Sequence, residues 1–137
     1  MKENYELRMQ AQLKGIEKGE RLLLHSCCAP CSSACLERLK EHFQITVLYY
    51  NPNIDEKGEY EKRKAEQIRF LQETGWADFL DCDHETEKFA ALAKGLEPEK
   101  ERGATSNSPF FQVMRAMSMM RRTAFWFVFI LSTSTPL

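Results

Sequence analysis

The sequence predicts an α/β protein in which a parallel sheet is flanked by helices. Strand-like and helix-like segments alternate along the chain with short connections, a pattern typical of parallel α/β folds. The first strand-like segment is a short apolar run, as expected of a strand that is buried on both faces of a sheet. With 137 residues, 43% hydrophobic and 28% charged, the chain has the composition of a globular protein with one modest core.

The first elements are a polar helix, a strand and a second helix. Residues 1–20 combine helical spacing of apolar side chains with many charges, so we expect a lead-in helix. Arg21–His25 is the short apolar run that predicts a buried strand. The helical spacing that starts at Pro30 continues as far as Phe43. Proline suits the first turn of a helix because its missing N–H would have no partner there.

The following elements continue the alternation. Ile45–Tyr50 is β-branched and aromatic throughout and gives the clearest strand signal. We expect a helix over Gly58–Glu73 that stops at Gly75, a short strand over Asp78–Cys82 and a last helix over Glu85–Leu96. The inner face predicted for the first of these two helices consists of Tyr60, Ala65, Ile68 and Leu71.

The last part of the chain differs in composition from the rest. All 20 acidic residues precede Ala104, whereas 104–137 carries four of the six methionines. We therefore expect a lead-in helix (1–20), an α/β domain with the cysteines (21–103) and an atypical aromatic and Met-rich tail (104–137). The long apolar run Ala124–Leu131 has eight residues, too few to span a membrane, which takes about 20. We predict no membrane association.

Charge and cysteine usage narrow the classes of function. A formal net charge of −1 gives no general reason to bind nucleic acid, so any RNA contact would need a local patch. The charged, polar amino-terminal residues do not resemble a secretory signal. Four of the five cysteines crowd into Cys27–Cys35, which is not the pattern of a secreted disulfide framework. We therefore expect a cytoplasmic protein that uses cysteines for metal binding or redox chemistry.

Cys27, Cys28 and Cys31 are the candidate functional residues. They follow the first predicted strand and open the next helix, which places them at the carboxyl edge of the sheet, where α/β proteins bind ligands. A helix start favours the thiolate, the form that binds iron or attacks a disulfide. Three sulfurs near one point suit an iron–sulfur cluster that takes a further ligand from elsewhere. For Cys35 and Cys82, a packing role is the favoured interpretation.

Two other functions use the same cysteines. The chain fits a small non-catalytic module that binds zinc or iron, with thiolates around the metal. Cys28-Ala29-Pro30-Cys31 also has the spacing of a thiol–disulfide oxidoreductase. An aromatic residue usually precedes such a pair, whereas Cys27 stands there in this chain, so this function is the least favoured.

Four segments resemble, in order and at compatible spacing, motifs of QueH-type epoxyqueuosine reductases. They are Leu22–Ser32 (Leu-Leu-Leu-His-Ser-Cys-Cys-Ala-Pro-Cys-Ser), Ile45–Ile54, Glu59–Arg63 and Lys94–Glu97, and the resemblance covers Glu20–Gly103. It implies a fold similar to that of the nucleotide α-hydrolase-like, PP-loop-related proteins. It also implies reduction of the epoxide of epoxyqueuosine in tRNA to the alkene, the last step of queuosine synthesis.

The resemblance also implies cofactors, partners and roles. Cys27 and Cys28 match two ligands of a [4Fe–4S] cluster. Cys31 matches the position near a second, mononuclear iron and is the expected catalytic residue. The implied partners are a tRNA with a queuosine-type anticodon and an electron donor that the sequence does not identify.

Several further residues are weaker candidates. Tyr50, Asn51 and Asn53 follow a strand end, where they would line a substrate pocket, although turn formation explains them equally well. Glu59 and Arg63 are four residues apart on a helix, which favours a surface ion pair over a tRNA contact. A structural role is favoured for His25.

The resemblance ends near Gly103. The family continues with a Cys-x-x-Cys that supplies further cluster ligands, whereas this chain has no cysteine after Cys82. Because acidic residues, cysteines and family motifs are lost at one point, our hypothesis is a frameshift or truncation there. We accordingly expect this chain to be a partial or inactive copy.

Overall fold

The fold is described from a computed structural model, which describes residues 4–94 and 126–129. Its elements are α1 (Tyr5–Leu13), β1 (Glu20–His25), α2 (Ala29–Leu39), β2 (Phe43–Tyr49), α3 (Lys57–Thr74), β3 (Asp78–Asp81), α4 (Thr86–Ala93) and β4 (Trp126–Phe129). The predicted α/β class, with a parallel sheet and flanking helices, is confirmed.

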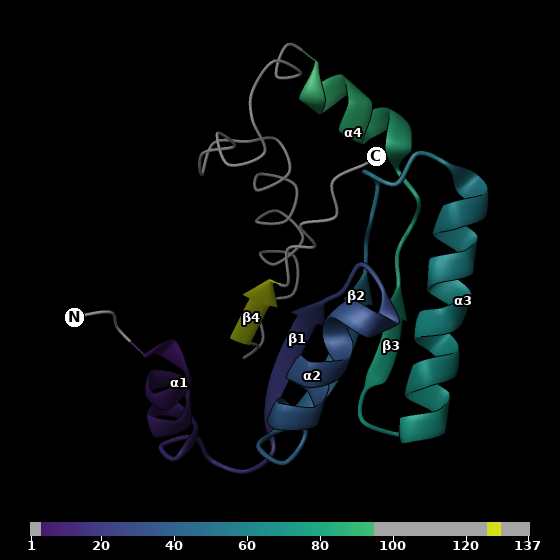
Figure 1. Ribbon diagram of the computed structural model, residues 1–137. Coiled ribbons are helices and arrows are strands. Elements are labelled where there is room, and N and C mark those ends of the chain that lie inside the picture. The colour runs from purple at the N-terminus through teal and green to yellow at the C-terminus, as the bar shows by residue number, and fades with distance from the viewer. Residues whose placement is uncertain (1–3, 95–125, 130–137) are drawn as a thin grey trace.

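The strands form one sheet in the order β3-β2-β1-β4, and every neighbouring pair is parallel (Figure 1). The chain proceeds from β1 to β2 to β3 in one direction, and β4 returns to the other side of β1. Leu22 of β1 lies opposite Ile45 of β2 on one side and Trp126 of β4 on the other. The carboxyl end of β1 is therefore a topological switch point, where ligands bind in open α/β sheets.

β4 belongs to the segment that we expected to form an atypical tail. The sequence predicted no strand there, but Trp126–Phe129 pairs with Leu22–His25 of β1. The proposed boundary at Gly103 lies outside the described residues. The division into 1–20, 21–103 and 104–137 therefore stays a prediction.

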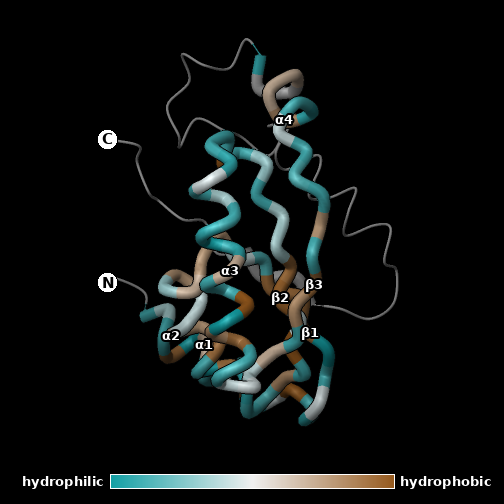
Figure 2. The backbone as a smooth tube through the Cα atoms, turned by 90° about the vertical axis from the view of Figure 1, so that its right-hand side faces the viewer, coloured by the Kyte–Doolittle hydropathy of each residue, from teal (hydrophilic) through white to brown (hydrophobic). Residues whose placement is uncertain are grey.

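The core lies between the sheet and the helices α2 and α3, which lie side by side on one face of it (Figure 1). Its buried residues are Leu22, Leu24, Leu36, Ile45, Val47 and Leu71. Leu23 and Leu48 are also buried, and they point to the opposite face because side chains alternate along a strand. Figure 2 shows the hydrophobic stretches concentrated in the strands, whereas α3 is largely hydrophilic.

α3 ends where the sequence predicted, and its buried face agrees with the predicted one at Tyr60 and Leu71 but not at Ala65. Gly75 adopts a left-handed conformation (φ 65°), and its N–H donates to the carbonyl of Leu71 at 2.8 Å, as glycine commonly does after a helix. Tyr60, Gln67 and Leu71 are buried, whereas Ala65 is exposed. At about 100° per residue the three buried positions fall within about 40° of one another, and Ala65 lies about 140° from Tyr60.

The other helices are shorter than predicted. α2 stops at Leu39 instead of continuing to Phe43, because Phe43 starts β2 opposite Glu20 and packs against the core. Among the described residues 4–20 only Tyr5–Leu13 is helical, and none of the residues of this helix is buried. The ion pair between Glu6 and Arg38 joins it to α2. Among the described helices, none is both long enough and apolar enough to cross a membrane.

Candidate metal centre at the carboxyl edge of the sheet

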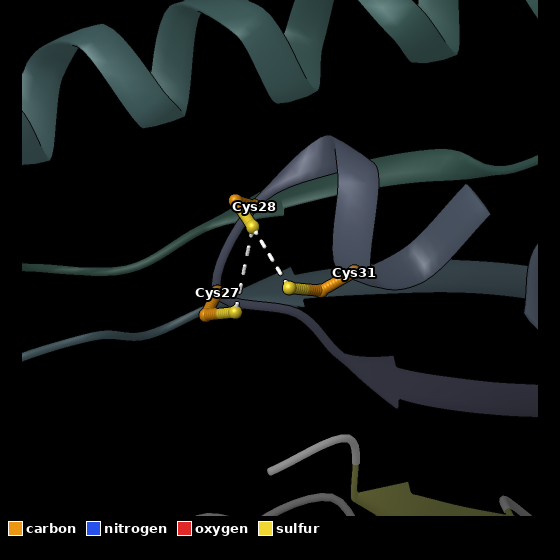
Figure 3. A group of neighbouring side chains, drawn as sticks. All are labelled: Cys27, Cys28 and Cys31. Carbon is orange, nitrogen blue, oxygen red and sulfur yellow. Dashed lines mark hydrogen bonds between the residues drawn. The ribbon is translucent and has the colours of Figure 1, made fainter. Parts of the chain in front are cut away.

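The three candidate cysteines meet where β1 passes into α2. Cys27 and Cys28 lie two and three residues after His25, the last residue of β1, and Cys31 lies in the first turn of α2. Cys28 is the N-cap residue of α2 and has an extended backbone (φ −168°, ψ 161°), and a proline follows in the first turn. The change from extended to helical backbone within one residue folds the chain back on itself, so that Cys31 returns toward Cys27 and Cys28 (Figure 3).

The sulfur atoms of these residues form a compact group. Cys27 Sγ lies 3.7 Å from Cys28 Sγ, and Cys28 Sγ lies 3.1 Å from Cys31 Sγ. All three sulfurs lie within 4.8 Å of one another. Two thiolates on one tetrahedral metal ion lie about 3.8 Å apart when the metal–sulfur bonds are about 2.3 Å. The Cys27–Cys28 distance matches this value, and Cys28 and Cys31 would have to move apart to share a metal. The three thiols could therefore hold a metal, with Cys27 buried and the other two half-buried.

Without a metal, the thiol of Cys28 stays protonated. Burial raises its pKa to about 12, and the hydrogen bond to the sulfur of Cys31 adds to the increase. At a helix start we expected a lowered pKa and a thiolate. The pKa is raised instead, because the cost of removing the charged form from water outweighs the effect of the helix. Metal binding releases the thiol proton, so a bound cation would supply the charge that stabilises the thiolate.

The remaining cysteines are not part of this group. Cys35 lines a separate groove of about 620 Å³ at the other end of the sheet, together with Met9 of α1 and Leu39 of α2. Cys82 follows β3, and its backbone carbonyl accepts a hydrogen bond from Tyr60 Oη at 3.5 Å. Among the described residues, the group that could hold a metal contains three cysteines and no fourth ligand.

Two of the three residues predicted to line a substrate pocket support the cysteine turn. Asn51 is buried, and its Nδ2 donates to the carbonyl of Ser26 at 2.9 Å. The carbonyl of Tyr50 is 2.7 Å from His25 Nε2, and because a carbonyl only accepts, this nitrogen carries the hydrogen. Tyr50 Oη also donates to Glu85 Oε2 at 3.1 Å. Asn53 is exposed. A role of these residues toward substrate stays a prediction.

His25 is a buried residue that lies two positions before Cys27. It is 4% exposed, and burial lowers the pKa of its imidazole although the Tyr50 carbonyl acts in the opposite direction. The side chain is therefore neutral at pH 7 and links the end of β1 to the end of β2. This arrangement supports the structural role that the sequence favoured.

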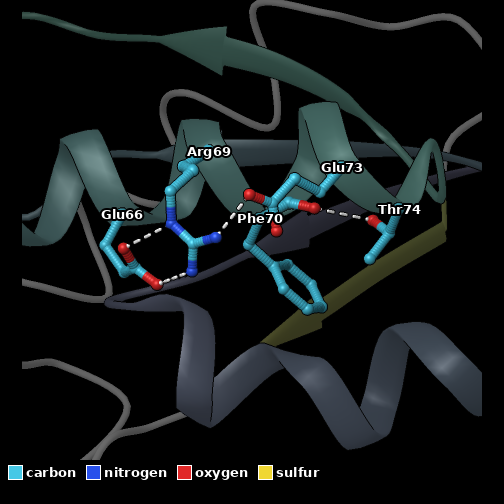
Figure 4. A network of polar contacts seen from close by, with 5 residues as sticks. All are labelled: Glu66, Arg69, Phe70, Glu73 and Thr74. Atoms are coloured by element: carbon cyan, nitrogen blue, oxygen red, sulfur yellow. Dashed lines mark hydrogen bonds and ion pairs between the residues drawn. The ribbon is translucent and has the colours of Figure 1, made fainter.

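The charges on α3 are largely paired. Arg63 Nε donates to Glu59 Oε1 at 2.6 Å, the ion pair that the spacing predicted. The hydrogen bond from Arg63 to Glu59 raises the pKa of the guanidinium. Further along α3, the guanidinium of Arg69 pairs with two glutamates (Figure 4). These pairings favour a solvated helix face at Arg69 over a phosphate-binding patch.

Three residues beside the cysteines were not predicted from the sequence. Gln67 Oε1 accepts hydrogen bonds from Ser26 Oγ at 2.7 Å and from Ser32 Oγ at 3.2 Å, and all three side chains are buried. Two signals could have drawn attention to them. The serines directly flank the cysteine motif, and Gln67 is a polar residue seven positions from Tyr60, on the face that α3 buries.

The fold and the thiol group together define an α/β protein with three clustered cysteines that could hold a metal at the switch point of a parallel sheet. Comparison with known families then gives a narrower assignment. The sequence profile of the family described as Epoxyqueuosine reductase QueH matches residues 22–130, which extends beyond Gly103, where we expected the resemblance to end. The chain therefore belongs to the QueH family.

Similar proteins carry the same description. The chain is 43% identical to epoxyqueuosine reductase QueH of Acinetobacter baylyi over 67% of its own length and 42% of that protein. It is 46% identical to the Haemophilus influenzae protein of that name (61% and 34% of the two chains) and 40% identical to the Staphylococcus epidermidis protein (67% and 42%). The chain thus spans less than half the length of these relatives. No solved structure matches it, so the likeness to nucleotide α-hydrolase-like proteins stays a prediction.

Proposed function

We propose that this chain is the cysteine-bearing part of an enzyme that reduces the epoxide of epoxyqueuosine in tRNA to the alkene of queuosine. The observation that supports the proposal is the group of three sulfurs within 4.8 Å at the switch point of the sheet, in a chain of this family. Removing the epoxide oxygen as water consumes two electrons and two protons. The site must therefore receive electrons from a donor and polarise the epoxide oxygen.

Cys27 and Cys28 would hold two corners of a [4Fe–4S] cluster, and Cys31 would serve a second, mononuclear iron. Ligands of different irons lie farther apart than two ligands of one ion, so the sulfurs of Cys27 and Cys28 would separate from 3.7 Å when the cluster binds. When bound, iron supplies electron transfer and Lewis acidity toward the epoxide oxygen. The chain's own residues hold the cysteines in place: Asn51 binds the carbonyl of Ser26, and His25 ties the end of β1 to β2. We place this reaction in the cytoplasm.

We further propose that the 137-residue chain does not turn over by itself. A [4Fe–4S] cluster usually takes four cysteine ligands, whereas the group in the described residues has three. We expect the purified chain, supplied with iron, sulfide and a reductant, to leave epoxyqueuosine in tRNA unchanged. Nucleoside analysis of the treated tRNA measures this directly, and formation of queuosine would refute the proposed inactivity.

Iron binding tests the proposed centre independently of turnover. After anaerobic reconstitution, we expect brown protein with bound iron and sulfide, and a Cys28→Ser variant with much less of both. Cys82→Ser is the matched control and should retain the wild-type content, because Cys82 lies outside the thiol group. Equal iron in all three proteins would exclude Cys28 as a ligand.

A zinc-binding module without catalysis is the second candidate. The Cys27–Cys28 sulfur separation of 3.7 Å is close to the value of about 3.8 Å for two thiolates on one tetrahedral zinc. Protein isolated with stoichiometric zinc, and unable to exchange it for iron, would favour this function. A thiol–disulfide oxidoreductase is less favoured, since the raised pKa of Cys28 opposes the thiolate that disulfide exchange needs.

A further inference from the structure

A buried hydrogen-bond network connects α3 to both ends of the cysteine turn. Ser26 directly precedes Cys27, and Ser32 directly follows Cys31. The side-chain amide of Gln67 lies between the two serine hydroxyls, at 2.7 Å from Ser26 Oγ and 3.2 Å from Ser32 Oγ. The two serines and the glutamine are fully buried. One side chain of α3 therefore touches the residue before the first candidate ligand and the residue after the last.

The same hydroxyls also reach the backbone of the turn. Ser26 Oγ is 3.0 Å from the carbonyl oxygen of Cys28, and Ser32 Oγ is 3.2 Å from that of Ala29. Each hydroxyl has one hydrogen to donate, so it cannot serve the amide and the backbone at once. If the amide is turned by 180°, its nitrogen donates to both serine oxygens and both hydroxyls are left to donate to the backbone. In either orientation Gln67 bonds both serines.

Packing alone does not account for a glutamine at this position. The side chain is wholly removed from solvent, and the amide group that faces away from the serines (Nε2 when Oε1 faces them) has no hydrogen-bond partner among the described residues. Burying an amide that is only partly hydrogen-bonded is unfavourable, whereas a methionine of similar length would fill the space without that cost. The interaction that Gln67 does make is with the two serines beside the cysteines.

We infer that Gln67 is a positioning residue for the metal centre. Through Ser26 and Ser32 it fixes the two ends of the turn that carries Cys27, Cys28 and Cys31, and so holds their sulfurs close together before metal binds. The inference rests on the proposed function in one respect, that these cysteines bind a metal. Residues that orient metal ligands through hydrogen bonds typically change metal affinity by about 10- to 100-fold when they are replaced.

Titration of the 137-residue chain with Co²⁺ under anaerobic, reducing conditions tests the inference. Cobalt bound to thiolates absorbs in the near ultraviolet by charge transfer and in the visible by transitions sensitive to geometry, so affinity and ligand arrangement are both read. We expect Gln67→Met to weaken Co²⁺ binding by about 10- to 100-fold and to change the visible bands. Gln72→Met is the matched control, since Gln72 is exposed on the same helix, and it should behave as wild type.

The outcomes separate this inference from the proposed function. A Gln67→Met chain with wild-type circular dichroism, wild-type affinity and a wild-type cobalt spectrum would overturn the positioning role and leave the thiolate site intact. A wild-type chain that fails to bind Co²⁺ through thiolates would overturn both. If Gln67→Met does not fold, Ser32→Ala decides: weaker binding with altered bands supports the inference, and unchanged binding refutes it.

Discussion

Replacing Asn51 by alanine should separate a structural role from a substrate-binding role at the edge of the cysteine turn. Asn51 is 2% exposed, and its Nδ2 donates to the carbonyl of Ser26 at 2.9 Å. Ser26 is also fully buried, so water cannot replace the lost donor. The variant leaves a buried carbonyl without this partner, next to the first candidate metal ligand.

The expected magnitude follows from that geometry. A buried acceptor that loses its partner costs about 1–3 kcal/mol. For a chain of this size, a loss of about 2 kcal/mol corresponds to a decrease in Tm of about 6–8 °C. Asn53→Ala is the matched control, because Asn53 lies in the same turn but is exposed, and exposed substitutions usually change stability by less than about 0.5 kcal/mol.

Urea unfolding followed by circular dichroism, with thermal unfolding as a second measurement, would give both values. We expect the midpoint to fall for Asn51→Ala and to stay unchanged for Asn53→Ala. Equal midpoints for the two variants would refute the claim that Asn51 supports the cysteine turn. Equal midpoints would instead favour the prediction that Asn51 lines a substrate pocket.

Three other predictions concern the rest of the fold. Because burial lowers the pKa of His25, its contribution to stability is complete above about pH 6.5 and is lost as pH falls toward and through the lower folded value. The free energy of unfolding, measured with urea from pH 7 to pH 5, should therefore fall by at most about 1.4 kcal/mol per pH unit for this one proton. The decrease should be smaller in His25→Gln, and equal slopes in the two proteins would contradict this. Leu24→Ala removes a fully buried core side chain and should cost about 2–5 kcal/mol in the same assay, whereas Leu7→Ala, at an exposed position of α1, should be neutral. Arg69→Ala removes only exposed ion pairs and should leave Tm unchanged, so a large decrease would show that this network stabilises α3.

The local elements were predictable because their signals are local. The β-branched and aromatic run of Ile45–Tyr50 predicted β2 to within two residues at its start and one at its end. The end of α3 at Gly75 was predictable because glycine adopts the left-handed conformation that follows a helix without strain. The placement of Cys27, Cys28 and Cys31 at the carboxyl edge followed from their position between a strand and a helix.

Other features depend on contacts between distant segments and carry little local signal. Phe43 satisfies helical spacing with Leu39 and also suits a strand, and only its pairing opposite Glu20 decides between the two. The strand at Trp126–Phe129 depends on an interaction with β1 across about a hundred residues of sequence. The buried amide of Gln67 became visible only when α3 was packed over the cysteine turn, because its partners are more than 30 residues away in the chain.

The position of β1 between β2 and β4 also sets an order of events during synthesis. Only α2 and its short connections separate β1 from β2 in the sequence. Trp126, in contrast, is synthesised about a hundred residues after Leu22, with which it pairs. At translation rates of about 5–20 residues per second, that interval is about 5–20 s. During this interval the edge of β1 that later pairs with β4 has no neighbour, although the cysteine turn has already been synthesised. A cation could therefore reach the thiols before the sheet is complete.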